Sequence, residues 1–305
     1  MPLDDFLAGK LHLIEGIQPD QLADAETRAR RLEFNRDPAA WQPPAVAVED
    51  LEIPGPHGSI PVRLYGRRDA TSALVWLHGG GFRAGDLDMP EAHVVSTELA
   101  ARADALVASV GYRLAQGEVR YPVPLDDAHA AWRWFTTEMR PGGRVALGGA
   151  SAGAALALST AIRERDAAGR LADLLLLAYP FAHFPNPALD DDLAAELAAL
   201  PSVIRSTARD VEFMVRNYVG RISGIPADAL PGAAPLHGLP PVHLIACEYD
   251  DLRASADLLA RQLADAGVAV DTHLAIGMLH GHLNRTPALS ETDRSLGFFA
   301  TALRT

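Results

Sequence analysis

From residue 46 onward, apolar and polar side chains follow a strand-like period and a helix-like period in turn. Residues 46–53 and 59–65 alternate apolar and polar positions around a Pro-Gly-Pro turn, which predicts a β-hairpin. Pro61 predicts that the second arm lies at an edge of the sheet, because proline cannot donate to a strand ladder. Further strands are predicted at residues 73–77, 106–110, 145–147, 174–178, 242–247 and 271–275.

Helical spacing follows most of these strands. The predicted helices lie at residues 91–103, 124–137, 151 onward, 253–266 and 291–303. Short apolar strands that alternate with helices predict an α/β fold, in which a mostly parallel sheet is covered by helices on both faces.

Two segments depart from this alternation. Residues 1–45 have helical spacing and end at a Pro-Pro pair, which predicts helices lying on the rest of the molecule. Their predicted apolar stripe consists of Leu22, Ala25, Ala29 and Leu32. Residues 181–235 contain proline-flanked helical stretches and no clear strand, which predicts a helical insertion. The predicted core is therefore formed by residues 46–180 and 236–305.

Composition narrows the possible functions. The 305 residues are 49% hydrophobic and 22% charged, and the net charge of −12 argues against a nucleic-acid or anionic-membrane partner. The single cysteine, Cys247, excludes an internal disulfide, and the single lysine, Lys10, lacks the context of a P-loop or a pyridoxal site. No stretch is apolar for long enough to span a membrane, and the N-terminal residues do not resemble a signal peptide, so we expect a cytoplasmic protein.

The strand at 145–147 leads into Gly-Ala-Ser-Ala-Gly at residues 149–153, and an alanine-rich helix follows. This strand–turn–helix context is the one that a G-x-S-x-G nucleophile elbow requires. Small neighbours allow a sharp turn that exposes the Ser151 hydroxyl at the positive end of the helix. A glycine-rich turn that only packs a helix on a sheet would have the same local pattern.

The sequence His-Gly-Gly-Gly-Phe at residues 78–82 directly follows the strand at 73–77. Consecutive glycines let the backbone approach a substrate and point its N–H groups into a site. The N–H groups of Gly80, Gly81 and Ala152 are therefore predicted to form an oxyanion hole.

Candidate acids and bases follow the last two predicted strands. Glu248, Asp250 and Asp251 come first, and His280 and His282 come later. The order serine, acid, histidine is that of the α/β-hydrolases, in which histidine takes the serine proton and the acid orients the imidazole. A His-x-His metal pair is an alternative, but the chain offers no clear further ligands.

Over nearly its whole length, the chain resembles the hormone-sensitive-lipase family of carboxylesterases. The resemblance rests on the triple-glycine loop, Tyr-Arg-Leu-Ala at 112–115, the serine elbow, the acidic motif at 250–253 and His-Gly at 280–281. It implies an α/β-hydrolase fold with an eight-stranded sheet and a two-part helical cap, made of the N-terminal helices and residues 181–235. It also implies hydrolysis of esters with small to medium acyl chains and no cofactor.

The resemblance implies catalytic roles for Ser151, Asp250 and His280, and it favours Asp250 over the neighbouring acids and His280 over His282. Asp251 and His282 stand where the family has proline and phenylalanine. Some apolar residues could line a substrate pocket with His282 at its edge, although core packing explains each of them more simply. These residues are Phe82, Phe181, Phe213 and Met214.

Three other functions stay open at this point. An amidase, carbamate hydrolase or aryl-formamide hydrolase would use the same machinery. A non-catalytic small-molecule receptor on this fold is disfavoured, because serine, acid and histidine are all present. A dinucleotide-dependent oxidoreductase is disfavoured because neither glycine cluster forms G-x-G-x-x-G with a downstream acid. The expected partner is a small-molecule ester, and a homodimer would fit the family.

Overall fold

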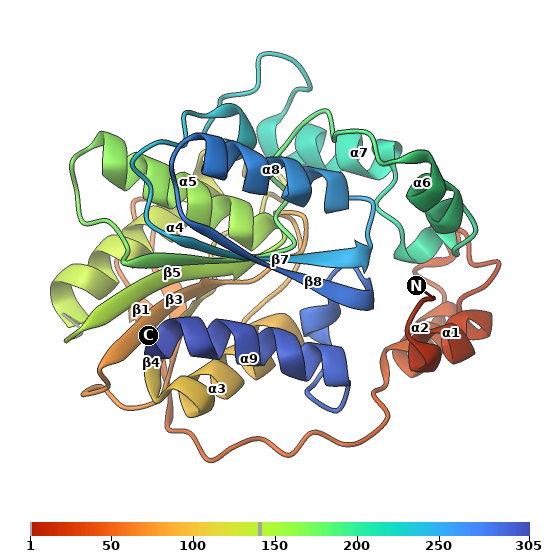
Figure 1. The fold of residues 1–305 in the computed structure, drawn as a ribbon, viewed down its shortest axis with the longest axis horizontal. Helices are drawn as coiled ribbons and strands as arrows, with labels where there is room; N and C mark the ends of the chain where they lie inside the picture. The colour runs from red at the N-terminus through yellow and green to blue at the C-terminus, as the bar shows by residue number, and fades with distance from the viewer. Residues whose placement is uncertain (1, 140–141) are drawn as a thin grey trace.

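One eight-stranded sheet runs through the computed structural model, which describes residues 2–139 and 142–305 (Figure 1). The strand order is β1-β2-β4-β3-β5-β6-β7-β8; β1 and β2 pair antiparallel with their neighbours, and all later pairs are parallel. The strands are β1 Val48–Ile53, β2 Ile60–Tyr65, β3 Ser72–Leu77, β4 Ala105–Val110, β5 Arg144–Ala150, β6 Leu174–Ala178, β7 Val242–Tyr249 and β8 Val270–Leu279. The predicted eight-stranded, mostly parallel sheet is confirmed.

Helices cover both faces of this sheet. Figure 1 shows α4, α5 and α8 on one face and α3 and α9 on the other. The α-helices are α1 Asp5–Lys10, α2 Ala25–Asn35, α3 Pro90–Ala103, α4 Val123–Trp134, α5 Ala152–Asp166, α6 Asp191–Ala198, α7 Ala208–Val219, α8 Arg253–Asp265 and α9 Ser290–Arg304. Neighbouring residues of β3 enter opposite cores: Val75 packs on the α5 side, and Trp76 packs on the α9 side. Burial on both faces explains why this strand is apolar from Ala73 to Leu77.

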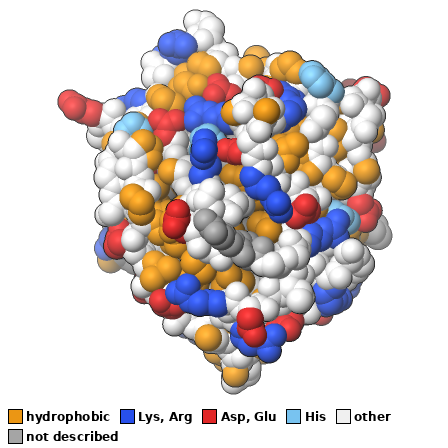
Figure 2. Space-filling view, turned by 90° about the vertical axis from the view of Figure 1, so that its left-hand side faces the viewer, with side chains coloured by type: hydrophobic (Ala, Val, Ile, Leu, Met, Phe, Trp, Pro, Cys, Tyr) orange, Lys and Arg blue, Asp and Glu red, His pale blue; other side chains and the backbone are white. Residues whose placement is uncertain are grey.

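The N-terminal helices and the insertion lie at one end of the sheet. In Figure 1 the arrowheads of β7 and β8 point toward α1, α2 and α6. This is the carboxyl end of the parallel strands, where open α/β sheets place their binding sites. Figure 2 shows the opposite end, where acidic and basic side chains are interspersed among apolar ones.

The predicted edge position of Pro61 is wrong, because β2 pairs with both β1 and β4. Pro61 lies opposite Glu52 of β1, but pairing with β4 begins one residue later, where Val62 lies opposite Val110. The missing N–H of Pro61 thus falls just beyond the second ladder, and its carbonyl accepts from the Gly111 N–H at 2.8 Å.

The apolar stripe predicted for residues 1–45 is wrong for Ala25, Ala29 and Leu32, which are exposed, whereas Leu22 packs partly buried against the core. Helix α2 buries Thr27 and Phe34, whereas Leu32 is 72% exposed. Two buried residues seven positions apart lie on the same face of a helix, and this face is offset from the predicted one. Leu32 instead lies on the wall of a cavity that is described below.

No helix among residues 2–139 and 142–305 has the length and apolar character needed to cross a lipid bilayer.

Candidate active site

Ser151 occupies the sharp turn between β5 and α5. Its backbone has φ +52° and ψ −115°, a conformation that residues other than glycine rarely adopt. Its N–H donates to the Ala178 carbonyl at 2.9 Å, which ties the turn to the neighbouring strand β6. A side chain at Gly149 or Gly153 would overlap backbone atoms, because the strand and the helix approach so closely here. The local sequence therefore imposes the turn that lifts the serine out of the backbone.

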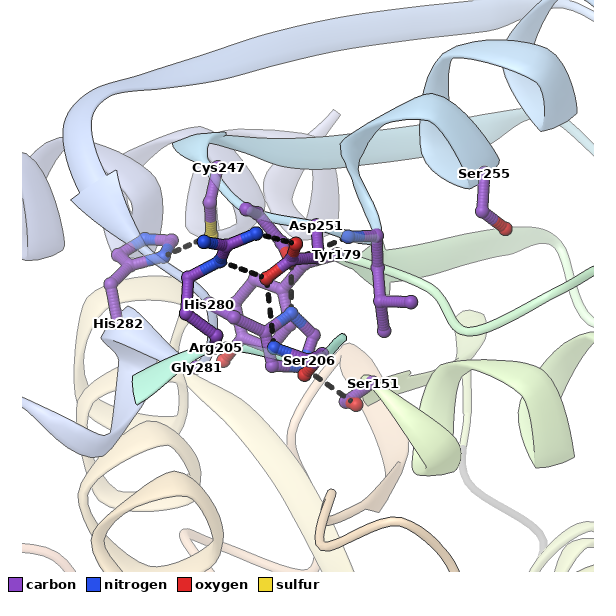
Figure 3. Close-up of polar contacts among 12 residues, drawn as sticks. Ser151, Tyr179, Arg205, Ser206, Cys247, Asp251, Ser255, His280, Gly281 and His282 are labelled. Carbon is purple, nitrogen blue, oxygen red and sulfur yellow. Dashed lines mark hydrogen bonds and ion pairs between the residues drawn. The ribbon is translucent and has the colours of Figure 1, made fainter. Parts of the chain in front are cut away.

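A continuous chain of hydrogen bonds links Ser151 to the ends of β7 and β8. His280 Nε2 lies 2.9 Å from Ser151 Oγ, and His280 Nδ1 lies 2.7 Å from Asp250 Oδ2 (Figure 3). Asp250 is buried, and its other oxygen accepts the Leu252 N–H at 2.8 Å. With the proton on Nδ1, the imidazole donates to Asp250 and can accept the serine proton at Nε2.

The environment of His280 favours its protonated form. Burial lowers the pKa of His280, but the charge of Asp250, the hydrogen bond to it and the nearby Glu91 and Asp251 outweigh burial and raise the pKa above its usual value. An imidazole with a raised pKa holds a proton more readily after taking it from serine.

The triple-glycine loop presents free backbone donors next to this chain. Gly80 and Gly81 have φ of +109° and +60°, so both positions require glycine. The Gly79 N–H is bonded to a side chain, whereas the N–H groups of Gly80, Gly81 and Ala152 have no acceptor within the described ranges. Unpaired N–H groups at the end of a sheet and at a helix N-terminus can stabilise a developing negative charge.

Comparisons with known proteins identify the family of this chain. A family model described as an alpha/beta hydrolase fold matches residues 74–284. The esterase LipI of Mycobacterium tuberculosis is 34% identical to this chain over 96% of the chain and 90% of the relative. The chain belongs to the hormone-sensitive-lipase-like family of α/β-hydrolases. The predicted family and fold class are thus confirmed.

Two further relatives of this hydrolase cover almost the whole chain. The ethyl acetate hydrolase of Pseudomonas putida is 28% identical over 100% of this chain and 99% of the relative. A solved esterase structure from Pyrobaculum calidifontis superposes with a TM-score of 0.81 at 29% identity, over 99% of this chain and 98% of the other. The chain therefore matches carboxylic ester hydrolases from end to end and is itself a carboxylic ester hydrolase.

Sequence analysis did not single out Glu91, which lies behind the oxyanion loop of the hydrolase. Its buried carboxylate accepts the Gly79 N–H at 2.6 Å, the Tyr179 hydroxyl at 2.6 Å and Asn284 Nδ2 at 3.1 Å. Burial raises the pKa of Glu91, and the bonds from Tyr179 and Gly79 oppose this rise. A lone glutamate in the first turn of a helix has the pattern of a solvated charge, so no sequence signal marks it.

The structure separates the four apolar residues predicted for the pocket. Phe82 and Phe181 are fully buried, and the Phe82 ring stacks on Tyr218 with centroids 3.8 Å apart. Phe213 is 53% exposed and lies under the Arg83 guanidinium. Met214 lies against the glycines of the loop: a side chain at Gly81 would come within 2.7 Å of its sulfur.

His282 borders the cavity beside His280, as predicted, but its ring turns away from solvent. His282 is buried, with Nε2 2.8 Å from Ser295 Oγ. Its Nδ1 lies 3.2 Å from Cys247 Sγ (Figure 3). Burial, together with His273 and His280, lowers the pKa of His282 to about 3. The ring is therefore neutral and points into the core. No group of three or more His, Cys, Asp or Glu side chains that could hold a metal occurs in the described ranges.

Both segments that lie at this end of the sheet bind the loops that carry Asp250 and His280. Asp251 in the acid loop pairs with Arg205 of the insertion. On the histidine side, the Asp4 N–H donates to the Gly277 carbonyl at 3.1 Å, and Asp37 accepts the Thr286 N–H at 2.8 Å. The N-terminal segment thus holds the chain on either side of His280.

Proposed function

We propose that this hydrolase cleaves carboxylic esters with small to medium acyl chains through an acyl-enzyme formed on Ser151. His280 takes the Ser151 proton as Oγ attacks the ester carbonyl, and Asp250 keeps the imidazole in the required tautomer. The hydrogen-bond chain from Asp250 through His280 to Ser151, at 2.7 and 2.9 Å, carries this proposal.

The negative charge that forms on the carbonyl oxygen is stabilised by the N–H groups of Gly80, Gly81 and Ala152. Loss of one such donor typically costs about 3–4 kcal/mol in the transition state. His280 then protonates the departing alcohol, which leaves the acyl group on Ser151. In the second half of the reaction, His280 deprotonates a water molecule, which attacks the acyl group and releases the acid. No cofactor takes part in this sequence of steps.

Residues 1–45 and 181–235 are proposed to form a two-part cap over the core, which consists of residues 46–180 and 236–305. The contacts that these segments make with the loops carrying Asp250 and His280 support this division. The ethyl acetate hydrolase among the relatives supports a preference for short esters.

The test compares p-nitrophenyl esters of graded acyl length with the matched p-nitroanilides. We expect ester cleavage to exceed anilide cleavage, and Ser151→Ala to abolish both ester turnover and labelling by a fluorophosphonate. Ser223→Ala, which changes an exposed serine of the insertion, is the matched control and should behave like the wild type. Rapid anilide cleavage with negligible ester cleavage would support an amidase instead, and a folded protein without a Ser151 adduct would contradict the acyl-enzyme.

A further inference from the structure

A cavity of about 570 Å³ opens beside the catalytic histidine, between the N-terminal segment and the insertion. Its wall includes His280, and its apolar part comes from both segments. The apolar residues include Leu32, Phe34, Val203 and Ile204. The charged side chains on the wall are Arg205 and Arg285, and no aspartate or glutamate belongs to it.

The two arginines differ in how their N–H groups are used. Arg205 donates twice to Asp251, at 2.8 and 2.6 Å, and once to the Leu197 carbonyl. Arg285 is just as buried, with 8% of its side chain exposed, but its hydrogen bonds within the described ranges amount to one contact of 3.5 Å to Asp37. The face of its guanidinium lies 5.2 Å from the centre of the Phe34 ring.

A guanidinium has five N–H donors and stays charged at all working pH values. Leaving most of them unpaired in a buried site is costly unless an anion or water satisfies them. Asp37 also accepts the Thr286 N–H, so its carboxylate is shared and supplies little of what Arg285 requires. The remaining donors of Arg285 suit a carboxylate, which a guanidinium binds with two parallel hydrogen bonds.

The chemistry of the triad decides which part of an ester reaches this cavity. His280 must protonate the oxygen of the departing alcohol, so the alcohol lies on the histidine side of Ser151. The acyl oxygen lies on the other side, against the N–H groups of the triple-glycine loop. His280 belongs to the cavity wall, whereas Ser151 and the triple-glycine loop do not, so the cavity adjoins the histidine side of Ser151, where the alcohol part lies.

We propose that this cavity binds the alcohol part of esters whose alcohol carries a carboxylate, and that Arg285 determines this specificity. The apolar wall takes the body of the alcohol, and Arg285 takes its carboxylate. On turnover the acyl group passes to Ser151 and then to water, and a hydroxy acid leaves with a proton from His280. This inference rests on the proposed esterase function and names a substrate class for it.

The experiment compares kcat/KM for 3-acetoxybenzoate with that for its neutral counterpart, 3-acetoxybenzamide. We expect Arg285→Met to lower the carboxylate-to-amide ratio about 10- to 100-fold, the loss typical of a charged hydrogen-bonded contact. Arg285→Lys should retain part of the preference, because it keeps the charge and loses the fork. Arg36→Met removes an arginine of the N-terminal segment, next to Asp37, whose side chain is 75% exposed, and it should keep the wild-type ratio.

An unchanged ratio in folded Arg285→Met would overturn the proposal. If that variant does not fold, inhibition of the wild type decides: 3-hydroxybenzoate should compete with a neutral ester at least ten-fold better than 3-hydroxybenzamide, and equal inhibition would overturn the proposal. The neutral substrate separates a failure of the carboxylate specificity from a failure of the esterase function. Hydrolysis of 3-acetoxybenzamide without an Arg285-dependent ratio contradicts the carboxylate specificity alone, whereas no hydrolysis of any ester contradicts the esterase function itself.

Discussion

Arg205 of the insertion and Asp251, the residue next to the triad carboxylate, form an ion pair joined by two hydrogen bonds of 2.8 and 2.6 Å (Figure 3). Asp251 also accepts the Ser206 N–H at 2.8 Å, and its carbonyl accepts Asn186 Nδ2 at 2.7 Å. Burial raises the pKa of Asp251, but the bonds from Arg205 and Ser206 outweigh it and keep this pKa below its usual value. The insertion therefore holds a charged carboxylate one residue from the catalytic acid.

The Arg205–Asp251 ion pair predicts that substitutions of its two members shift the pH profile of kcat/KM in opposite directions. The Asp251 charge helps to raise the pKa of His280, so Asp251→Asn should lower that pKa and move the acid limb of kcat/KM to lower pH. Arg205→Met leaves the Asp251 charge unopposed and should move the limb to higher pH. The measurement is the pH profile of kcat/KM on a neutral ester.

Arg216→Met is the control for this pair, since Arg216 makes an exposed ion pair with Glu212 on α7. It should leave the profile in place. Shifts in the same direction for Asp251→Asn and Arg205→Met would show that the two substitutions act through loop disorder instead of through charge.

Glu91→Gln should lower kcat about 10-fold to 100-fold with little change in KM. The amide keeps the size of the carboxylate but brings an NH₂ donor toward the Gly79 N–H or the Tyr179 hydroxyl, so one of the two bonds is lost. Loosening Gly79 displaces the donors that follow it, and those donors act mainly in the transition state. Steady-state kinetics on a short ester measures the split, and circular dichroism checks the fold. A rise in KM at constant kcat would assign Glu91 to ground-state binding instead.

Gly80→Ala should reduce kcat at least 100-fold, as expected when an oxyanion donor is lost. The added Cβ would overlap the carbonyl of Ala84 and require a side chain at φ +109°. Gly117→Ala is the matched control, because φ is +56° there and no atom lies within 4 Å of the added carbon. Equal activity in the two variants would rule out a specific role for the loop backbone.

His282→Phe should destabilise the fold most at neutral pH. The substitution leaves the Ser295 hydroxyl and the Cys247 thiol without their ring partner, at a cost of about 1–3 kcal/mol. Because the folded pKa of about 3 lies below the unfolded value, the unfolded chain binds more protons between these values. The contribution of His282 is complete above about pH 6.5 and is lost, at about 1.4 kcal/mol per pH unit, as pH falls toward 3.

Urea unfolding at pH 7, 5.5 and 4 tests this prediction. The stability difference between wild type and His282→Phe should shrink, and can change sign, as the pH falls. A difference that stays constant over this range would mean that His282 is not kept neutral in the folded protein.

The sheet and its helices could be predicted from periodicity because burial on both faces leaves a simple apolar signal, as in β3. The candidate catalytic residues could be placed at one end of the sheet because each follows a predicted strand. Asp250 and Asp251 could not be assigned different surroundings, since the partner of Asp251 lies 46 residues earlier in the sequence.

Where the prediction failed, the deciding contact was distant in the sequence. His282 borders the cavity as predicted, yet its ring turns inward and bonds to Ser295 of α9, which the sequence did not indicate. Tertiary packing buries the face of α2 that carries Thr27 and Phe34, whereas hydrophobicity alone favoured Leu32. Short-range spacing predicts elements well, but it does not predict which distant side chain will satisfy a polar group.

The bonds from Asp4 to Gly277 and from Asp37 to Thr286 have a consequence for how substrates arrive. These bonds hold the chain on both sides of His280 against the N-terminal segment. Moving that segment away would break them and loosen the imidazole while the substrate enters. An N-terminal segment that opened in each catalytic cycle would thus displace His280 and inactivate the enzyme each time. We therefore expect substrates to enter through the cavity beside His280, whose wall includes Leu32, while the N-terminal segment stays in place.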